Sequence, residues 1–236
     1  DLPVPLTLIE IDTLPDDLVG EEFATRLEAM LALELDALIA VPSSMRFIEA
    51  LLAKGLPIVA LHYRDLVHPL FSCLPELYSS AHLVCQHLVK ILGGKGRILV
   101  VGGQRDYVRS APSSRLRAAL DVFGVAPEIE CVQIPAPWDY AGAIEALWDG
   151  LADVEHRFDG IFGLSDSLAL AGREVCVQLG LIASDGVVVG INGDPLAIAA
   201  IAKGEMAATV ATSASEVAHE SLKVARMAAR GQPIPP

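Results

Sequence analysis

The sequence predicts an α/β fold in which parallel strands are covered by helices. Short apolar runs alternate along the chain with longer helical stretches, and most of these runs are continuously apolar instead of alternating with polar residues. A strand that is apolar on both sides is buried on both faces, as in a parallel sheet between helices. Glycines that follow the helical stretches, such as Gly124 and Gly180, are typical of helix ends.

The elements follow in order from these two periodicities. Strands are expected at residues 6–11, 37–41, 57–62, 97–101, 129–134, 160–163, 187–191 and 207–211. Apolar residues at helical spacing predict helices at residues 21–34, 77–92, 113–123, 140–154, 166–179, 195–203 and 215–230. Residues 67–75 contain two prolines and no clear period, so we expect a boundary between two lobes there.

Composition excludes several classes of protein. The 236 residues are 53% hydrophobic, which excludes a disordered chain, and no apolar run reaches the length of a membrane span. The 30 acidic and 17 basic residues give a net charge of −13, so we expect no direct binding of nucleic acid. The four cysteines form no C-x-x-C pair and predict neither a disulfide framework nor a metal site.

Known catalytic and cofactor motifs are incomplete. The segment 93–97 has a lysine between glycines but lacks the spacing and the hydroxyl of a phosphate-binding loop. The segment 163–167 approaches the nucleophile elbow G-x-S-x-G but lacks its closing glycine. The six histidines form no metal-ligand pattern. We therefore expect no enzyme activity, no cofactor and no metal.

Polar and aromatic residues collect where the predicted strands end. In parallel sheets these carboxyl ends meet at one edge, and ligands bind there. Aromatic rings beside Arg, Asp and Asn suit a neutral, polyhydroxylated ligand, because sugar C–H faces stack on rings while the polar groups bond the hydroxyls. The alternatives are local: Asp166 as a helix cap, Asn192 as a turn residue and Trp138 as a packing residue. The candidate ligand-binding residues are His62, Tyr63, Arg64, Arg115, Trp138, Tyr140, Ser165, Asp166, Asn192 and Thr212.

Six segments carry a family resemblance, in order: residues 36–43, 56–61, 94–103, 160–170, 188–195 and 203–212. They resemble segments of the type I periplasmic binding proteins, which are the sugar-binding components of ABC transporters, and of the related ligand-binding cores of lac-repressor-type regulators. In this family a strand-end Asp-Arg pair falls here on His62 and Tyr63, with Arg64 adjacent. The second-lobe arginine falls on Arg115, and the stacking aromatic falls on Trp138 with Tyr140 close by.

Three further family contacts fall on later strand ends. The family's Asn-Asp pair is similar to Ser165 and Asp166 here, its later aspartate falls on Asn192, and its glutamine falls on Thr212. The resemblance implies two similar lobes, each a mostly parallel sheet flanked by helices, joined by a hinge. Lobe one would be residues 1–72 plus 213–236, without the family's first strand and helix, and lobe two would be residues 73–212.

The resemblance implies a solute-binding domain that closes on a small, sugar-like ligand for ABC transport. Its partners would be that ligand and a membrane permease or receptor, and its location periplasmic or extracytoplasmic. Two alternatives share the fold: the sensing domain of a membrane histidine kinase or other receptor, and the effector-binding core of a lac-repressor-type regulator, which would be cytoplasmic.

Overall fold

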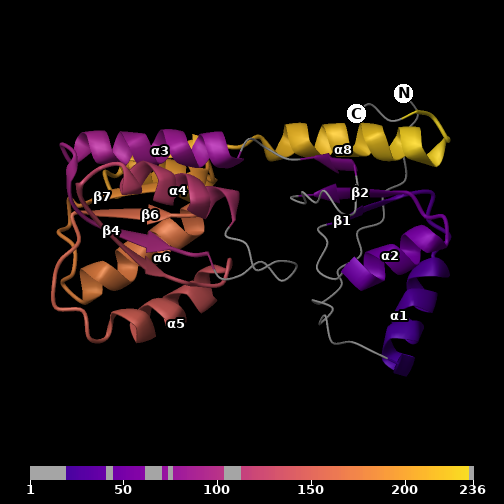
Figure 1. Cartoon of the computed structure of the whole chain (residues 1–236), viewed down its shortest axis with the longest axis horizontal. Coiled ribbons are helices and arrows are strands. Elements are labelled where there is room, and N and C mark those ends of the chain that lie inside the picture. Colours follow the sequence, from indigo (N-terminus) through magenta and orange to yellow (C-terminus); the bar gives the residue numbers. More distant parts are fainter. Residues whose placement is uncertain (1–19, 41–44, 62–70, 74–76, 104–112, 234–236) are drawn as a thin grey trace. The chain divides into compact units, whose positions relative to one another are not determined.

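The computed structural model describes residues 20–40, 45–61, 71–73, 77–103 and 113–233, and the chain divides into two compact units (Figure 1). One unit consists of residues 1–74 and 215–236, and the other of residues 75–214. Both units are α/β, as the apolar periodicity predicts. No helix in the described ranges is long and apolar enough to cross a membrane.

The first unit contains a three-stranded parallel sheet in the order β1-β2-β3. Successive residues of β2 point to opposite faces, so Ile58 packs with helices α1 and α2 whereas Val59 packs with helix α8. Both faces are therefore covered, as continuous apolar strands require (Figure 1). The elements are α1 (Gly20–Leu31), β1 (Leu38–Ala40), α2 (Met45–Ala53), β2 (Ile58–Leu61), β3 (Phe71–Cys73) and α8 (Ala214–Ala229).

Two elements of this unit differ from the sequence prediction. Helix α2 was not predicted, although Phe47, Ile48 and Leu51 form its buried stripe. At nine residues the helix is too short to give a clear period. Strand β3 lies within residues 67–75, where the prolines had suggested only a boundary. The strand predicted at residues 6–11 lies outside the described residues.

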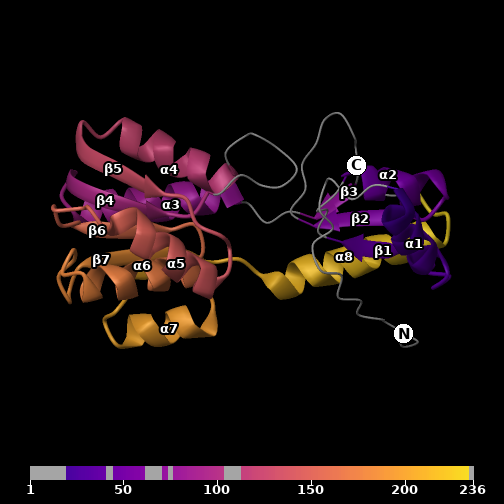
Figure 2. The same ribbon diagram turned by 90° about the horizontal axis from the view of Figure 1, so that it is seen from below.

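The second unit contains a five-stranded parallel sheet in the order β5-β4-β6-β7-β8. Helices α3 and α4 cover one face and α5 and α6 the other, while α7 lies beside α6 near the β8 edge (Figure 2). The strands are β4 (Lys95–Val101), β5 (Glu128–Ile134), β6 (Gly160–Gly163), β7 (Val187–Asn192) and β8 (Ala208–Ala211). The helices are α3 (Leu77–Ile91), α4 (Ser114–Gly124), α5 (Tyr140–Leu151), α6 (Asp166–Gln178) and α7 (Pro195–Ala202).

The core of the second unit explains why its central strands read as unbroken apolar runs. Ile98, Leu99, Val100 and Val101 of β4 are all fully buried, because alternate residues face helices on opposite sides of the sheet. Phe162 of β6 is the largest side chain among the fully buried residues, and its ring packs edge-on against Phe123 of α4.

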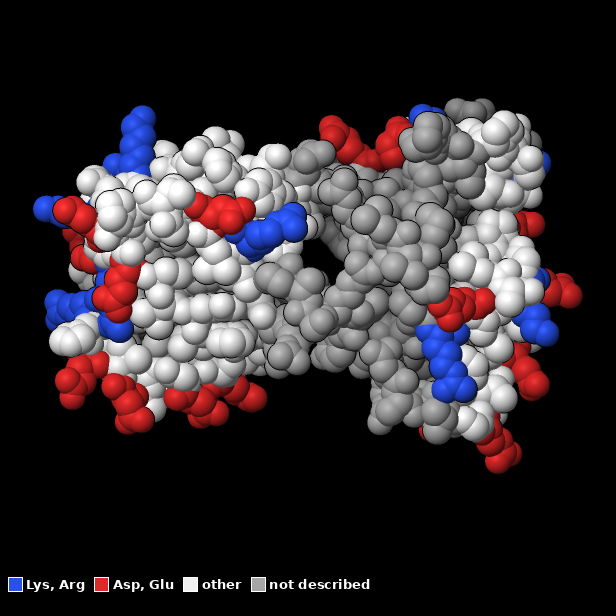
Figure 3. Space-filling model, in the orientation of Figure 1, with Lys and Arg blue, Asp and Glu red and all other residues white. Residues whose placement is uncertain are grey.

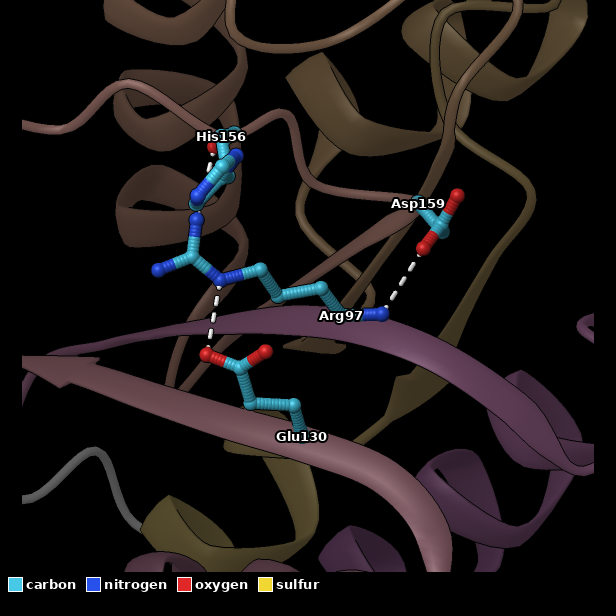
Figure 4. Close-up of polar contacts among 4 residues, drawn as sticks. All are labelled: Arg97, Glu130, His156 and Asp159. Carbon is cyan, nitrogen blue, oxygen red and sulfur yellow. Dashed lines mark hydrogen bonds and ion pairs between the residues drawn. The ribbon is translucent and has the colours of Figure 1, made fainter.

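The amino-terminal end of this sheet is held by Arg97 of β4 (Figure 4). Its guanidinium donates to Glu130 on β5 at 2.9 Å and to the His156 carbonyl at 2.7 Å, and it lies 4.9 Å from the centre of the Phe158 ring. Its backbone N–H donates to Asp159 at 2.7 Å. The guanidinium thus ties β4, β5 and the chain entering β6 together within the protein.

Candidate functional site

The carboxyl ends of the five strands lie together at the end of the sheet opposite Arg97. We call this carboxyl end of the sheet the sheet edge. Val101 of β4 pairs with Gly163 of β6, and Asn192 of β7 pairs with Ala211 of β8, so the residues that follow these strands are neighbours. Of the ten residues predicted to bind a ligand, seven lie in this unit. His62, Tyr63 and Arg64 lie outside the described residues.

Arg115, near the start of α4, is the central cation of this edge. Its side chain is largely buried, with 7% of the residue exposed, and Nη1 donates to the carbonyl of Leu164 at 2.5 Å. Leu164 follows β6, and its N–H in turn donates to Val101 of β4, so the guanidinium is fixed against the sheet edge. Burial lowers the pKa of Arg115, and the nearby carboxylates of Asp166 and Asp194 act in the opposite direction. The side chain stays charged because arginine starts from a very high pKa.

Among the described residues, this carbonyl is the one hydrogen-bond acceptor of the Arg115 guanidinium. A guanidinium carries several further N–H donors in a planar fork, and buried donors are normally satisfied. Only one of these donors has a protein acceptor within the described ranges. This contrasts with Arg97 at the other end of the sheet, whose guanidinium bonds two protein oxygens.

Trp138 lies between β5 and α5 and stacks with Arg115. The guanidinium carbon of Arg115 is 5.6 Å from the centre of the Trp138 ring, which is within cation–π range. The residue nevertheless remains 41% exposed. The indole therefore presents an exposed apolar face beside the Arg115 guanidinium.

Ser165 and Asp166 begin helix α6 directly after β6. Ser165 caps the helix, because its Oγ accepts from the N–H of Leu168 at 3.3 Å. Asp166 is fully buried, and both carboxylate oxygens are used: Oδ1 accepts from the Thr209 hydroxyl at 2.7 Å and Oδ2 from the N–H of Asp194 at 2.8 Å. Burial raises the pKa of Asp166, and these hydrogen bonds oppose the rise. Asp166 therefore ties α6 to the ends of β7 and β8.

Asn192 and Thr212 complete the edge at the ends of β7 and β8. Asn192 has φ +136°, a backbone conformation that residues with a side chain rarely adopt, and Gly193 follows with φ +75°. The N–H of Thr212 donates to the Asn192 carbonyl at 3.0 Å. Unusual backbone conformations of this kind concentrate at binding sites.

Tyr140 is not brought into this cluster. Its hydroxyl donates to the carboxylate of Glu174, which lies more than two turns along α6 from Asp166. Burial and this partner raise the pKa of Tyr140 to about 12. Tyr140 is the first residue of α5, and its hydroxyl reaches across to α6.

Neither Thr209 nor the Leu164 carbonyl was predicted from the sequence. Thr209 lies in the middle of β8, where a threonine is an ordinary strand residue, and backbone carbonyls carry no sequence signal. Gln133 of β5 was also missed; its Nε2 donates to the Gly102 carbonyl at 3.0 Å. Within the described residues there is no group of three or more His, Cys, Asp or Glu side chains that could hold a metal ion.

Comparison with known proteins now identifies the family. A model of the periplasmic binding protein domain matches residues 11–233, nearly the whole chain. The chain belongs to this family. Membership in a family of binding proteins confirms the resemblance found in the sequence and the expectation of a non-enzymatic protein. No curated protein gives a significant match to the sequence.

Solved structures of periplasmic binding proteins share the fold. An ABC transporter solute-binding protein of Bacillus halodurans with bound myo-inositol is 22% identical, covers 92% of this chain and 76% of its own, and has a TM-score of 0.76. One of Actinobacillus succinogenes with bound D-allose is 22% identical, covers 91% and 78%, and has a TM-score of 0.73. A periplasmic component of a sugar transport system from Hahella chejuensis is 21% identical, covers 89% and 78%, and has a TM-score of 0.76. The predicted α/β class is confirmed.

Proposed function

We propose that this periplasmic binding protein domain is the solute-binding component of an ABC transporter and that its solute is a sugar or polyol. Family membership supports the binding role. Similar folds with bound D-allose, myo-inositol and glycerol support the class of solute. The proposal includes the two lobes predicted from the sequence, which are residues 1–72 with 213–236 and residues 73–212.

The observation that carries the proposal is the pair formed by Arg115 and Trp138. Arg115 is buried yet makes a single hydrogen bond to the described protein, and Trp138 presents an exposed ring beside it. A sugar needs both features, because its hydroxyl oxygens accept hydrogen bonds while its C–H faces pack on an aromatic ring. Ser165, Asn192 and Thr212 would supply further polar contacts, and Asp166 would act through its neighbours.

The partners follow from the transport role. The solute-loaded protein would dock on a membrane permease, and the protein would act outside the cytoplasm, as the family name implies. Acidic side chains, including Glu145 and Asp149, gather over α5 of the second unit (Figure 3). Together with the net charge of −13, such a surface disfavours nucleic acid as a partner.

The test is isothermal titration of the whole chain with D-allose, myo-inositol, D-glucose, D-galactose, L-arabinose and glycerol. The chain has two tryptophans, so Trp148→Phe leaves Trp138 as the only fluorescent indole and gives a second, local signal. We expect at least one sugar or polyol to bind with a saturable change in Trp138 fluorescence. Absence of binding across the panel would overturn the proposed solute class.

A further inference from the structure

The turn that follows β7 has a backbone that must be held in place. Asn192 at φ +136° is followed by Gly193 at φ +75°. Glycine adopts positive φ freely, but a residue with a side chain persists there only when the surrounding structure fixes it. The structure therefore has to supply contacts that hold this turn.

Two side chains from distant parts of the sequence, the buried Asp166 and the half-buried Thr209, supply these contacts. Thr209 Oγ1 accepts from the N–H of Gly193 at 3.2 Å, and Asp166 Oδ2 accepts from the N–H of Asp194 at 2.8 Å. The Thr209 hydroxyl also donates to Asp166 Oδ1 at 2.7 Å, which joins the two side chains into one network. Successive N–H groups of the turn are thus bound to a single Asp–Thr pair.

Gly190 of β7 leaves space for the Asp166 carboxylate because it has no side chain. A Cβ atom at Gly190 would lie 2.4 Å from Asp166 Oδ1, so any larger residue would displace the carboxylate. Asp166 itself is fully buried, and both of its oxygens bond protein groups. The carboxylate consequently has no free oxygen aimed at a ligand, and its contacts are those of a residue that orients others.

We propose that Asp166 and Thr209 are positioning residues that hold the Asn192–Asp194 turn, and that they thereby set the direction in which the Asn192 amide leaves the end of β7. The part that concerns the ligand rests on the proposed function. A side-chain amide both donates and accepts hydrogen bonds, and so does a sugar hydroxyl. A fixed amide can therefore bond two adjacent hydroxyls, which favours polyols over ligands with isolated acceptors.

Thr209→Val tests the positioning role without any ligand, because valine keeps the shape and removes the hydroxyl. Amide hydrogen exchange should accelerate at least tenfold at Gly193 and Asp194 and stay unchanged at Leu168, whose N–H is held by Ser165. Thr209→Ser should retain the slow exchange. Asp159→Asn is the matched control, since it alters a carboxylate that accepts a backbone N–H at the opposite end of the sheet. Unchanged exchange at Gly193 and Asp194 in Thr209→Val would overturn the proposal.

A double-mutant cycle tests whether the network acts through Asn192. Using the panel sugar that binds best, we expect Thr209→Val to weaken binding about tenfold, or about 1.4 kcal/mol. In an Asn192→Ala background the same change should have no further effect, because the oriented amide is already gone. An equal tenfold loss in both backgrounds would overturn the link to Asn192. If no panel sugar binds the unaltered chain, the proposed function fails, while hydrogen exchange still decides the positioning role.

Discussion

Replacing Arg115 by methionine removes the guanidinium and keeps much of the side-chain volume. The change deletes the 2.5 Å hydrogen bond to the Leu164 carbonyl and the cation that lies 5.6 Å from the Trp138 ring centre. It also deletes the N–H donors that have no acceptor among the described residues. Stability and solute binding should therefore respond to this substitution very differently.

The expected loss of stability is small because two effects oppose each other. A hydrogen bond from a charged group contributes about 1.5–3 kcal/mol, and a desolvated cation–π contact about 2 kcal/mol. Burying an unpaired cation costs several kcal/mol, and methionine avoids that cost. We expect a net change in the unfolding free energy within about 2 kcal/mol, and a shift of Tm within about 8 °C for a chain of this size.

For sugar binding, no opposing effect offsets the loss of the guanidinium. If two N–H groups of Arg115 bond sugar oxygens, their loss costs about 3–6 kcal/mol in binding free energy. At about 1.4 kcal/mol for each tenfold change, the dissociation constant should rise about 100-fold or more. The dissociation constant of Arg115→Lys should lie between those of the unaltered chain and Arg115→Met, because lysine keeps the charge but loses the planar fork.

The assay is isothermal titration with the best panel sugar, together with thermal unfolding followed by circular dichroism. Arg97→Met is the matched control, because Arg97 is an arginine of the same sheet whose guanidinium bonds Glu130 and the His156 carbonyl. The control should lower the unfolding free energy and leave affinity unchanged. An Arg115→Met protein that folds and binds within threefold of the parent would refute this reasoning.

Three other predictions concern single side chains. Trp138→Ala should weaken sugar binding at least tenfold while changing the unfolding free energy by about 1 kcal/mol or less, because the residue is 41% exposed; titration and thermal unfolding measure the two effects. Burial raises the pKa of Asp166 above its ordinary 3.8, so the folded chain keeps a proton that the unfolded chain releases, and stability falls as pH rises from about 3.8 through the raised pKa. Asp166→Asn should therefore gain stability relative to the parent across that range in urea titrations, and a constant difference would contradict the prediction. Burial raises the pKa of the Cys176 thiol to about 12, so this thiol should resist a thiol reagent at pH 8 until the chain unfolds. Peptide mapping locates the label, because Cys131 is only half-buried, and rapid labelling of Cys176 itself in the folded chain would contradict its burial.

The sequence predicted those features of the candidate site whose signal is local. Ser165 and Asp166 follow an apolar strand and precede a helical period, so a helix start at the sheet edge could be inferred from residue order alone. Arg115 was predicted from its place at the start of an expected helix and Trp138 from its place between an expected strand and helix, and the structure has both at these places. The direction of a side chain is different, because it depends on packing between distant segments. Residue order therefore does not indicate that the Tyr140 hydroxyl bonds Glu174.

Thr209 and strand β3 could not be predicted because their roles depend on pairing between distant segments. Thr209 is an ordinary strand residue in the sequence and gains its role only when β8 lies beside β7 and brings its hydroxyl to Asp166. The same limit applied to β3, a three-residue strand in a proline-containing segment that is defined by its pairing with β2. Short elements that form only through tertiary contacts have too little periodicity to be recognised from sequence.

The most direct test of the central claim is a crystal structure of the chain with the best-binding panel sugar. We predict sugar oxygens within hydrogen-bond distance of the Arg115 guanidinium and a C–H face of the sugar packed on the Trp138 ring. A sugar bound elsewhere, with no contact to either residue, would contradict the assignment of the binding site to the carboxyl edge of this sheet.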